Sequence, residues 1–268
     1  MIRSVFVYLF LSFVALLSRL FYRFQQQWVG PIPKDPWAVP YRLVAILNHT
    51  SLFEFLYAGI TSRKFLWRMA RHGTVPIADI TIDRPIVGLF WRFIAGNIVS
   101  VSRERDATWD KVMASIHDPD AMVIILPEGR MKRASGLDKY GRNLQVRGGI
   151  ADLVMSIPEG ELLLAYSQGL HHIQVPGQHL PRFFKPVRMR LEIVDIRAYR
   201  ERLMEGLDPS DTMAFRKRVI QDLTERRDRL CTSNRGGEDE PEGTWPPGRF
   251  LRAPGHTAND QKSADPRA

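Results

Sequence analysis

The sequence predicts an α/β fold, with a mixed, largely parallel sheet flanked by helices and preceded by an N-terminal membrane-associated helix. Residues 43–47 and 123–126 are apolar runs too short for typical helices, and each ends abruptly in polar residues, as buried strands do. Between a strand at 98–101 and the strand at 123–126, apolar side chains recur at helical spacing: Trp109, Val112, Met113 and Ile116. This strand-helix-strand order predicts a crossover between parallel strands.

The N-terminal segment is apolar and aromatic. Residues 4–18 carry no charge and lie between Arg3 and Arg19, and this run is shorter than the roughly 20 residues that span a bilayer. Seven Phe and Tyr side chains in the segment suit the membrane interface. We therefore expect residues 1–29 to hold a helix embedded in or lying on the membrane, with a cleaved signal peptide as the alternative.

The rest of the chain divides by composition. Residues 30–40 are rich in Pro and Gly and form a predicted linker, and residues 41–230 carry the apolar periodicity of a folded domain. Residues 231–268, rich in Gly, Pro and charged side chains, are predicted to be disordered.

A histidine follows the strand at 43–47. Asn48 breaks the strand, and Ser51 with Glu54 has the S-x-x-E spacing of a helix start, so His49 is expected on the turn between strand and helix, facing a crevice. On a regular helix, His49 and Glu54 would lie about 140° apart. The two side chains therefore meet only if His49 precedes the helix.

That geometry predicts a catalytic dyad. Glu54 would accept a hydrogen bond from one imidazole nitrogen and leave the other as a general base, with a hydroxyl as its target. The alternative is that Glu54 only closes a capping box with Ser51 and that His49 is an ordinary turn residue.

A second motif follows the strand at 123–126, where Pro127, Glu128, Gly129 and Arg130 stand in sequence. Asn-His-x4-acid followed by Pro-Glu-Gly-Arg resembles the glycerolipid acyltransferases, the family of lysophosphatidate and glycerol-phosphate acyltransferases. Residues 96–103 resemble the family's intervening Gly-strand-Arg element. This chain has Glu54 where the family usually has Asp, one extra residue in 96–103, and no proline before its fourth apolar strand, residues 162–166.

The resemblance implies a reaction and a site. Residues 41–230 would be the acyltransferase domain, moving a fatty acyl group from an acyl thioester to a hydroxyl of a lysophospholipid such as 1-acylglycerol 3-phosphate. His49 would be the base and Glu54 its partner, and no metal or cofactor is required. The donor would be acyl-CoA or acyl carrier protein, and the chain would lie on the cytoplasmic face of the plasma (inner) membrane.

The acceptor would be bound by residues near the two later motifs. Arg103, at the end of a strand, has the planar fork that grips phosphate, although a surface salt bridge with a neighbouring acid is the alternative. By resemblance, Glu128 binds the glycerol hydroxyl, Gly129 lets the backbone approach the substrate, and Arg130 helps to place the phosphate. Alternatively, Glu128 pairs with Arg130 or Lys132.

Charge and composition narrow the partners. A formal net charge of +9 predicts an acidic partner, and without any nucleic-acid-binding motif we expect a membrane surface or an acidic carrier rather than nucleic acid.

His171, His172 and His179 lack the cysteines or paired carboxylates of a metal cage, so we expect surface or turn roles for them. Cys231 is the only cysteine, which excludes an intrachain disulfide.

Three alternatives to this function stay open. A serine hydrolase of lipid esters would need a nucleophile, but no G-x-S-x-G motif occurs. A catalytically silent membrane-binding homologue is suggested by Glu54 and the changed fourth motif. An acyltransferase for a lyso-lipid outside the phosphoglycerides would use the same chemistry.

Overall fold

The computed structural model describes residues 2–79, 97–102, 107–175, 178, 180–232, 236–237, 240–241 and 243–246. Its centre is a seven-stranded sheet in the order β1-β7-β6-β2-β5-β3-β4. The strands are β1 (Arg23–Val29), β2 (Tyr41–Leu47), β3 (Gly73–Ala78), β4 (Asn97–Val101), β5 (Met122–Ile125), β6 (Glu161–Ser167) and β7 (Pro186–Asp195).

The sheet is mixed and largely parallel, which confirms the predicted fold class. Only β6 and β7 pair antiparallel, while every other neighbouring pair of strands is parallel. The two strands that precede the sequence motifs are direct neighbours, with Leu43 of β2 opposite Val123 of β5. Their carboxyl ends therefore meet at one edge of the sheet, where α/β proteins bind ligands.

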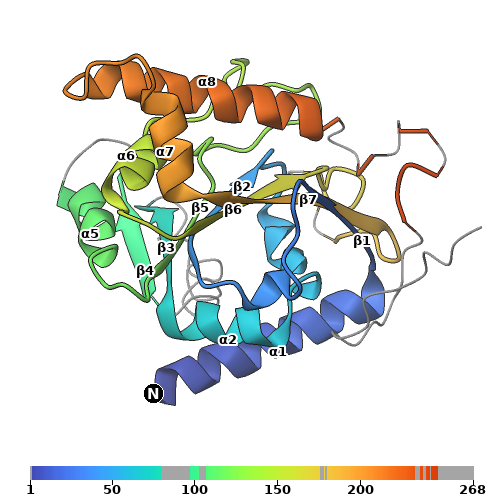
Figure 1. Cartoon of the computed structure of the whole chain (residues 1–268). Coiled ribbons are helices and arrows are strands. Elements are labelled where there is room, and N and C mark those ends of the chain that lie inside the picture. Colours follow the sequence, from blue (N-terminus) through green and yellow to red (C-terminus); the bar gives the residue numbers. More distant parts are fainter. Residues whose placement is uncertain are drawn as a thin grey trace, which may run out of the picture.

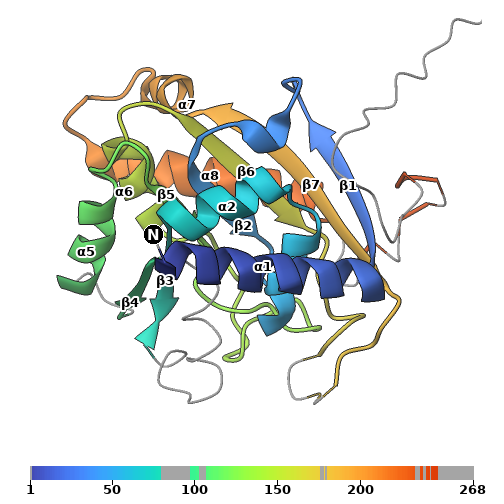
Figure 2. The same cartoon turned by 90° about the horizontal axis from the view of Figure 1, so that it is seen from below.

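Helices cover both faces of the sheet (Figure 1). α6, α7 and α8 lie over one face and α2 over the other, while α1 crosses outside α2 and is seen along its length in Figure 2. The helices are α1 (Ile2–Phe21), α2 (Arg63–His72), α5 (Ala107–Ser115), α6 (Gly149–Ser156), α7 (Ile196–Met204) and α8 (Thr212–Leu230), with 3-10 turns η1 (Pro36–Ala38) and η2 (Leu52–Gly59).

Each face of the sheet has its own apolar core. Leu43, Ala45 and Leu47 of β2 point into the core beneath α6 and α8, whereas Val44 points into the core on the α2 side. A strand buried on both faces has an uninterrupted apolar sequence, which is why residues 43–47 show no alternation of apolar and polar side chains.

Helix α1 packs on the domain as an integral element. Val7, Leu11 and Ala15 are buried against Leu66 and Ala70 of α2. The guanidinium of Arg19 donates hydrogen bonds to the carbonyls of Gly59 and Thr61, at 2.9 and 2.7 Å. Among the described residues, α1 is the one helix whose length and composition would allow it to cross a membrane.

The predicted membrane helix over residues 1–29 is too long. Helix α1 ends at Phe21, and Arg23–Val29 is strand β1, paired along its whole length with β7. The helix ends where the apolar run ends. The aromatic and amide side chains that follow find packing and hydrogen-bond partners in the sheet as part of β1. The ring of Phe24 then packs directly over Gly59 of η2.

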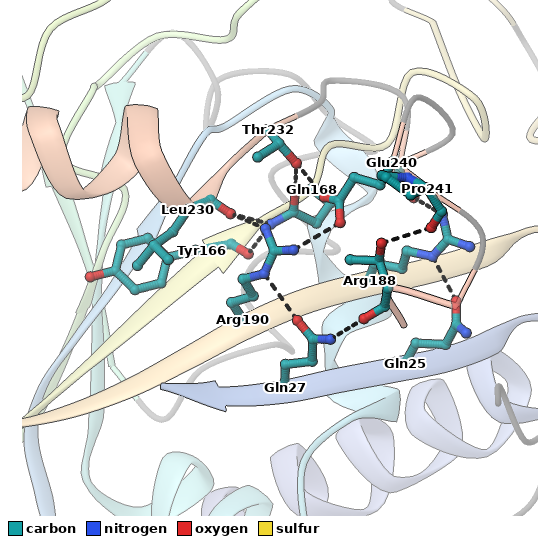
Figure 3. Close-up of polar contacts among 12 residues, drawn as sticks. Gln25, Gln27, Tyr166, Gln168, Arg188, Arg190, Leu230, Thr232, Glu240 and Pro241 are labelled. Atoms are coloured by element: carbon teal, nitrogen blue, oxygen red, sulfur yellow. Dashed lines mark hydrogen bonds and ion pairs between the residues drawn. The ribbon is translucent and has the colours of Figure 1, made fainter. Parts of the chain in front are cut away.

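The described residues of the C-terminal segment, 231–232, 236–237, 240–241 and 243–246, lie against the sheet, whereas the rest of the stretch predicted to be disordered, 231–268, lies outside the described residues. Arg190 of β7 is the centre of this contact: it donates to the Leu230 carbonyl, Gln27 and the Glu240 carboxylate (Figure 3). Its guanidinium also stacks on Trp245, with 4.7 Å between its central carbon and the ring centroid. This segment has few apolar residues. Its described part is held instead by hydrogen bonds from side chains of the sheet.

The contact between β1 and η2 can be tested by Gly59→Ala. A methyl group at Gly59 would lie 2.3 Å from the Phe24 ring, so we expect a loss of roughly 1–3 kcal/mol in the free energy of unfolding, measured with urea. Adding Phe24→Leu should recover part of that loss by making room. Equal stability of the parent and Gly59→Ala would contradict the placement of β1.

Candidate functional site

The turn after β2 is held in an unusual conformation. Asn48 has a φ of 64°, in the left-handed region, and its side-chain amide donates to the carbonyl of Ser167 at the end of β6, at 2.9 Å. Asparagine tolerates this region better than most residues. The turn therefore ends β2 sharply and directs His49 outward from the sheet edge.

His49 and Glu54 meet as the sequence predicts. His49 Nδ1 and Glu54 Oε2 are 2.7 Å apart, and the second carboxylate oxygen accepts the backbone N–H of Thr50 at 3.1 Å. Because η2 begins at Leu52, His49 precedes the helical turn. With Nδ1 donating to the carboxylate, Nε2 keeps its lone pair, and no residue in the described ranges hydrogen-bonds it.

The capping-box alternative is only partly met. Ser51 accepts the N–H of Phe53 and donates to Gln174, at 3.1 and 2.8 Å, and it is fully buried. Glu54 accepts the N–H of Thr50 rather than that of Ser51. The reciprocal exchange of a capping box is therefore absent between these two residues, and the carboxylate of Glu54 faces His49.

The electrostatics of the pair raise the pKa of His49. Burial opposes the charged imidazolium, but the charge of Glu54 and its hydrogen bond favour that form and outweigh the burial, with a smaller contribution from Glu128. The His49 side chain is 15% exposed, so part of it reaches the surface. A base with a raised pKa holds an abstracted proton more firmly than an isolated histidine does.

Glu128 fixes the turn that carries His49. Its carboxylate accepts the backbone N–H groups of Asn48 and His49, at 3.0 and 2.8 Å, and it is 2% exposed. Arg227 of α8, also buried, donates to the same carboxylate at 3.2 Å and to the carbonyl of Leu144 at 3.0 Å. Both oxygens of Glu128 thus have partners within the protein.

Arg227 was not predicted as a residue of the site, although the sequence of α8 contains a pattern that points to it. The buried stripe of α8 runs through Phe215, Val219 and Leu223 at steps of four, and Arg227 is the next step. An arginine on the apolar face of a helix requires a buried anion nearby. The stripe alone does not say which acid supplies it.

Arg130, one of the residues expected to bind the acceptor, has partners within the protein. Arg130 pairs with Asp138 at 2.7 Å and stacks on Tyr140. The pKa of Asp138 is lowered to about 2. The hydrogen bond from the backbone N–H of Arg142 contributes most, Arg130 adds to it, and burial acts in the opposite direction. Arg103 lies outside the described residues.

Gly129 has a φ of 63°, and the side chain of Arg147 lies over it. A Cβ there would be 3.2 Å from Arg147 Cδ, so the glycine allows a close approach by that arginine. The segment 131–147 is tied to the site, because the N–H of Lys132 donates to the His49 carbonyl at 2.7 Å.

An apolar cavity of about 120 Å³ lies beside the dyad, between the sheet and the layer formed by η2, α2 and α1. Glu54 is its only charged lining residue among those described. The other walls are aliphatic and aromatic and include Leu11, Phe55, Leu66, Met69, Val75 and Leu126. Such a mostly apolar space suits a hydrocarbon group better than a polar one.

The described residues contain no group of three or more His, Cys, Asp or Glu side chains suited to a metal ion. His171 and His172 lie in a turn, as predicted, but they are buried and not at the surface. His172 Nε2 contacts the Pro186 carbonyl at 2.6 Å.

Comparison with known proteins finds a likeness among solved structures. No family model matches the chain, and no curated protein matches it. Among solved structures, the crystal structure of the 1-acyl-sn-glycerophosphate (LPA) acyltransferase PlsC from Thermotoga maritima is similar, with 18% sequence identity and a TM-score of 0.44. The match covers 81% of this chain and 79% of that one. A likeness of this size says nothing about the reaction of the present chain.

The Arg227–Glu128 pair can be tested by stability. Arg227→Met leaves a buried carboxylate without its cation, so we expect a loss of about 3 kcal/mol in the free energy of unfolding, measured with urea. Arg229→Gln, an exposed change on the same helix, should cost less than about 0.5 kcal/mol. Glu128→Gln added to Arg227→Met should recover part of the loss, whereas equal losses in the Arg227 and Arg229 variants would refute the pair.

The contact between His49 and Glu54 predicts a raised His49 pKa, which a titration can measure. NMR of the His49 imidazole should show a pKa above the ordinary value of about 6.5, and Glu54→Gln should lower it. Since the native pKa is raised, the stability that the pair contributes is fully present below about pH 6.5 and is lost as pH rises through the native pKa. A pKa unaffected by Glu54→Gln would contradict the pairing.

Proposed function

We propose that this protein transfers a fatty acyl group from an acyl thioester to a hydroxyl group of a lipid, with His49 as general base and Glu54 as its partner. The observation that carries the proposal is the position of Glu54, which holds His49 with one oxygen and also lines the apolar cavity. A base for a hydroxyl and a space for hydrocarbon therefore adjoin through one side chain.

The reaction needs only one proton carrier. Neutral His49 removes the proton of the acceptor hydroxyl through Nε2 as the hydroxyl oxygen attacks the thioester carbonyl carbon. The tetrahedral intermediate then expels the thiolate, which takes the proton back from the imidazolium. The products are an ester and a free thiol, and Glu54 stabilises the transient imidazolium throughout.

The finer assignments are also proposals. The acceptor is a lysophospholipid such as 1-acylglycerol 3-phosphate, and the donor is acyl-CoA or acyl carrier protein. Arg103 and Arg130 contact the acceptor phosphate, and Gly129 lets the backbone approach it. Glu128 acts as a positioning residue, because its two oxygens hold the backbone of Asn48 and His49. The motif resemblance supports the roles given to Arg103, Arg130 and Gly129.

The location follows from the helix and the donors. One side of α1 packs on the domain and the other presents apolar side chains outward, which suits a helix lying in one leaflet. Acyl-CoA and acyl carrier protein are cytoplasmic, so we place the protein on the cytoplasmic face of the inner membrane.

Two alternatives differ in their support. A serine hydrolase is disfavoured because Ser51 is fully buried and hydrogen-bonded to Gln174. A catalytically silent homologue is favoured by one observation: Glu128 and Arg130, expected to hold the acceptor, are each paired within the protein. The short contact between His49 and Glu54 argues against it. The same chemistry would also serve a lyso-lipid outside the phosphoglycerides.

The test is transfer of a labelled acyl group by purified full-length protein in detergent, from each donor to a panel of lyso-lipids and glycerol phosphate. His49→Ala should reduce kcat by about 10²–10⁴-fold, since it removes the general base. His117→Ala, an exposed histidine outside the site, is the matched control. No product with any pair, or full activity of His49→Ala, would favour the silent homologue.

A further inference from the structure

The outward side of α1 is a continuous apolar surface. Its exposed side chains include Ile2 at 77%, Phe6 at 64% and Leu20 at 52%, and they lie opposite the buried stripe of the helix. Twenty residues of helix extend for about 30 Å. Apolar surface of this length on a helix is typical of one that lies in a membrane interface.

A second exposed apolar element adjoins the C-terminal end of this helix. Residues 180–185, which we call the aromatic loop, lead into β7 and lie beside the end of α1 (Figure 2). Leu180 is 74% exposed and Phe184 is 56% exposed. The loop is fixed to the helix: the N–H of Phe184 donates to the Phe21 carbonyl at 2.7 Å, and the rings of Phe183 and Phe21 are 5.2 Å apart.

The backbone of this loop is strained. Phe184 has a φ of 61°, a left-handed conformation that a bulky side chain rarely adopts. Such strain is found where the surrounding structure imposes it, and it clusters at functional positions. Here it holds an aromatic ring at the surface, where burial within the protein cannot compensate for it.

Cations accompany the aromatic side chains. Arg23 and Lys185 line a surface pocket of about 360 Å³ together with Phe183 and Phe184, and its described lining includes no carboxylate. Arg182 is exposed on the same loop. Aromatic side chains at the depth of the headgroups, with cations next to them, match the chemistry of an anionic membrane surface.

We propose that the aromatic loop is a second membrane-contact element, which acts with α1 to seat the protein on a bilayer that contains anionic phospholipid. Leu180 and Phe184 enter the interface, while Arg23, Arg182 and Lys185 lie at the level of the phosphates. Contacts at two places also fix how the domain is turned on the bilayer. This inference needs a membrane but not the proposed reaction, so it stands or fails independently of acyl transfer.

Vesicle sedimentation of the full-length protein tests the apolar part. With phosphatidylcholine vesicles containing phosphatidylglycerol, Leu180→Ser and Phe184→Asn should each weaken partitioning by about tenfold. Met213→Ser on α8, where the side chain is also 56% exposed, is the matched control and should bind as the parent does. Because asparagine tolerates a positive φ, Phe184→Asn should keep or raise Tm, which separates lost binding from lost folding.

The same assay tests the charged part. Replacing Arg182 and Lys185 with Gln should weaken binding to the anionic vesicles about 25-fold, about fivefold for each cation, with little change on phosphatidylcholine alone. The matched control removes two cations from exposed positions of α8, by Lys217→Gln and Arg229→Gln.

Unchanged binding of the Leu180 and Phe184 variants would overturn the proposal, as would equal losses in the two double charge variants. A parent protein that is dimeric without vesicles, and that Phe184→Asn makes monomeric, would instead assign the loop to an interface between copies.

Discussion

A buried carboxylate joins the parts of the chain that build the site. Glu128, at the end of β5, accepts the two N–H groups of the turn that ends β2, and Arg227 of α8 lies against it. Removing any of these partners would leave a charge or a polar group unpaired in the interior, which costs several kcal/mol. The turn before η2 is therefore rigid, and His49 is held within reach of Glu54.

The arrangement separates two tasks that acidic side chains perform at the same edge of the sheet. Glu128 holds backbone and is almost wholly occupied by the protein itself. Glu54 holds an imidazole whose other nitrogen is open, and it also borders the apolar cavity. Two glutamates close in space thus have different roles, because one faces N–H groups and an arginine while the other faces a titratable base.

Helix α1 connects the site to the surface. Leu11 is buried against α2 and also lines the cavity beside Glu54, while the other side of the same helix is apolar and exposed. One helix therefore lines the apolar cavity and also presents an apolar side outward, where the proposed membrane would lie. The aromatic loop adjoins the end of this helix, so a protein seated through both would have its cavity next to the bilayer.

Much of the site was predictable because it depends on local patterns. A short apolar run that ends in Asn48 and His49, followed by the spacing from Ser51 to Glu54, was enough to predict the dyad, since neighbours in sequence form it. The partners of Glu128 and Arg130 were not predictable in the same way. Arg130 takes a carboxylate eight residues away, through a loop conformation that no periodicity encodes.

By itself the sequence determined the α/β class, the parallel pairing of the motif strands and the meeting of His49 with Glu54. These follow from strand and helix periods and from the caps, which act over a few residues. The tertiary structure decided that Arg227, 99 residues from Glu128, neutralises it, and that residues 23–29 join the sheet instead of continuing the helix. Both depend on pairing between distant segments, where burial and hydrogen bonding select one partner among many that the sequence allows.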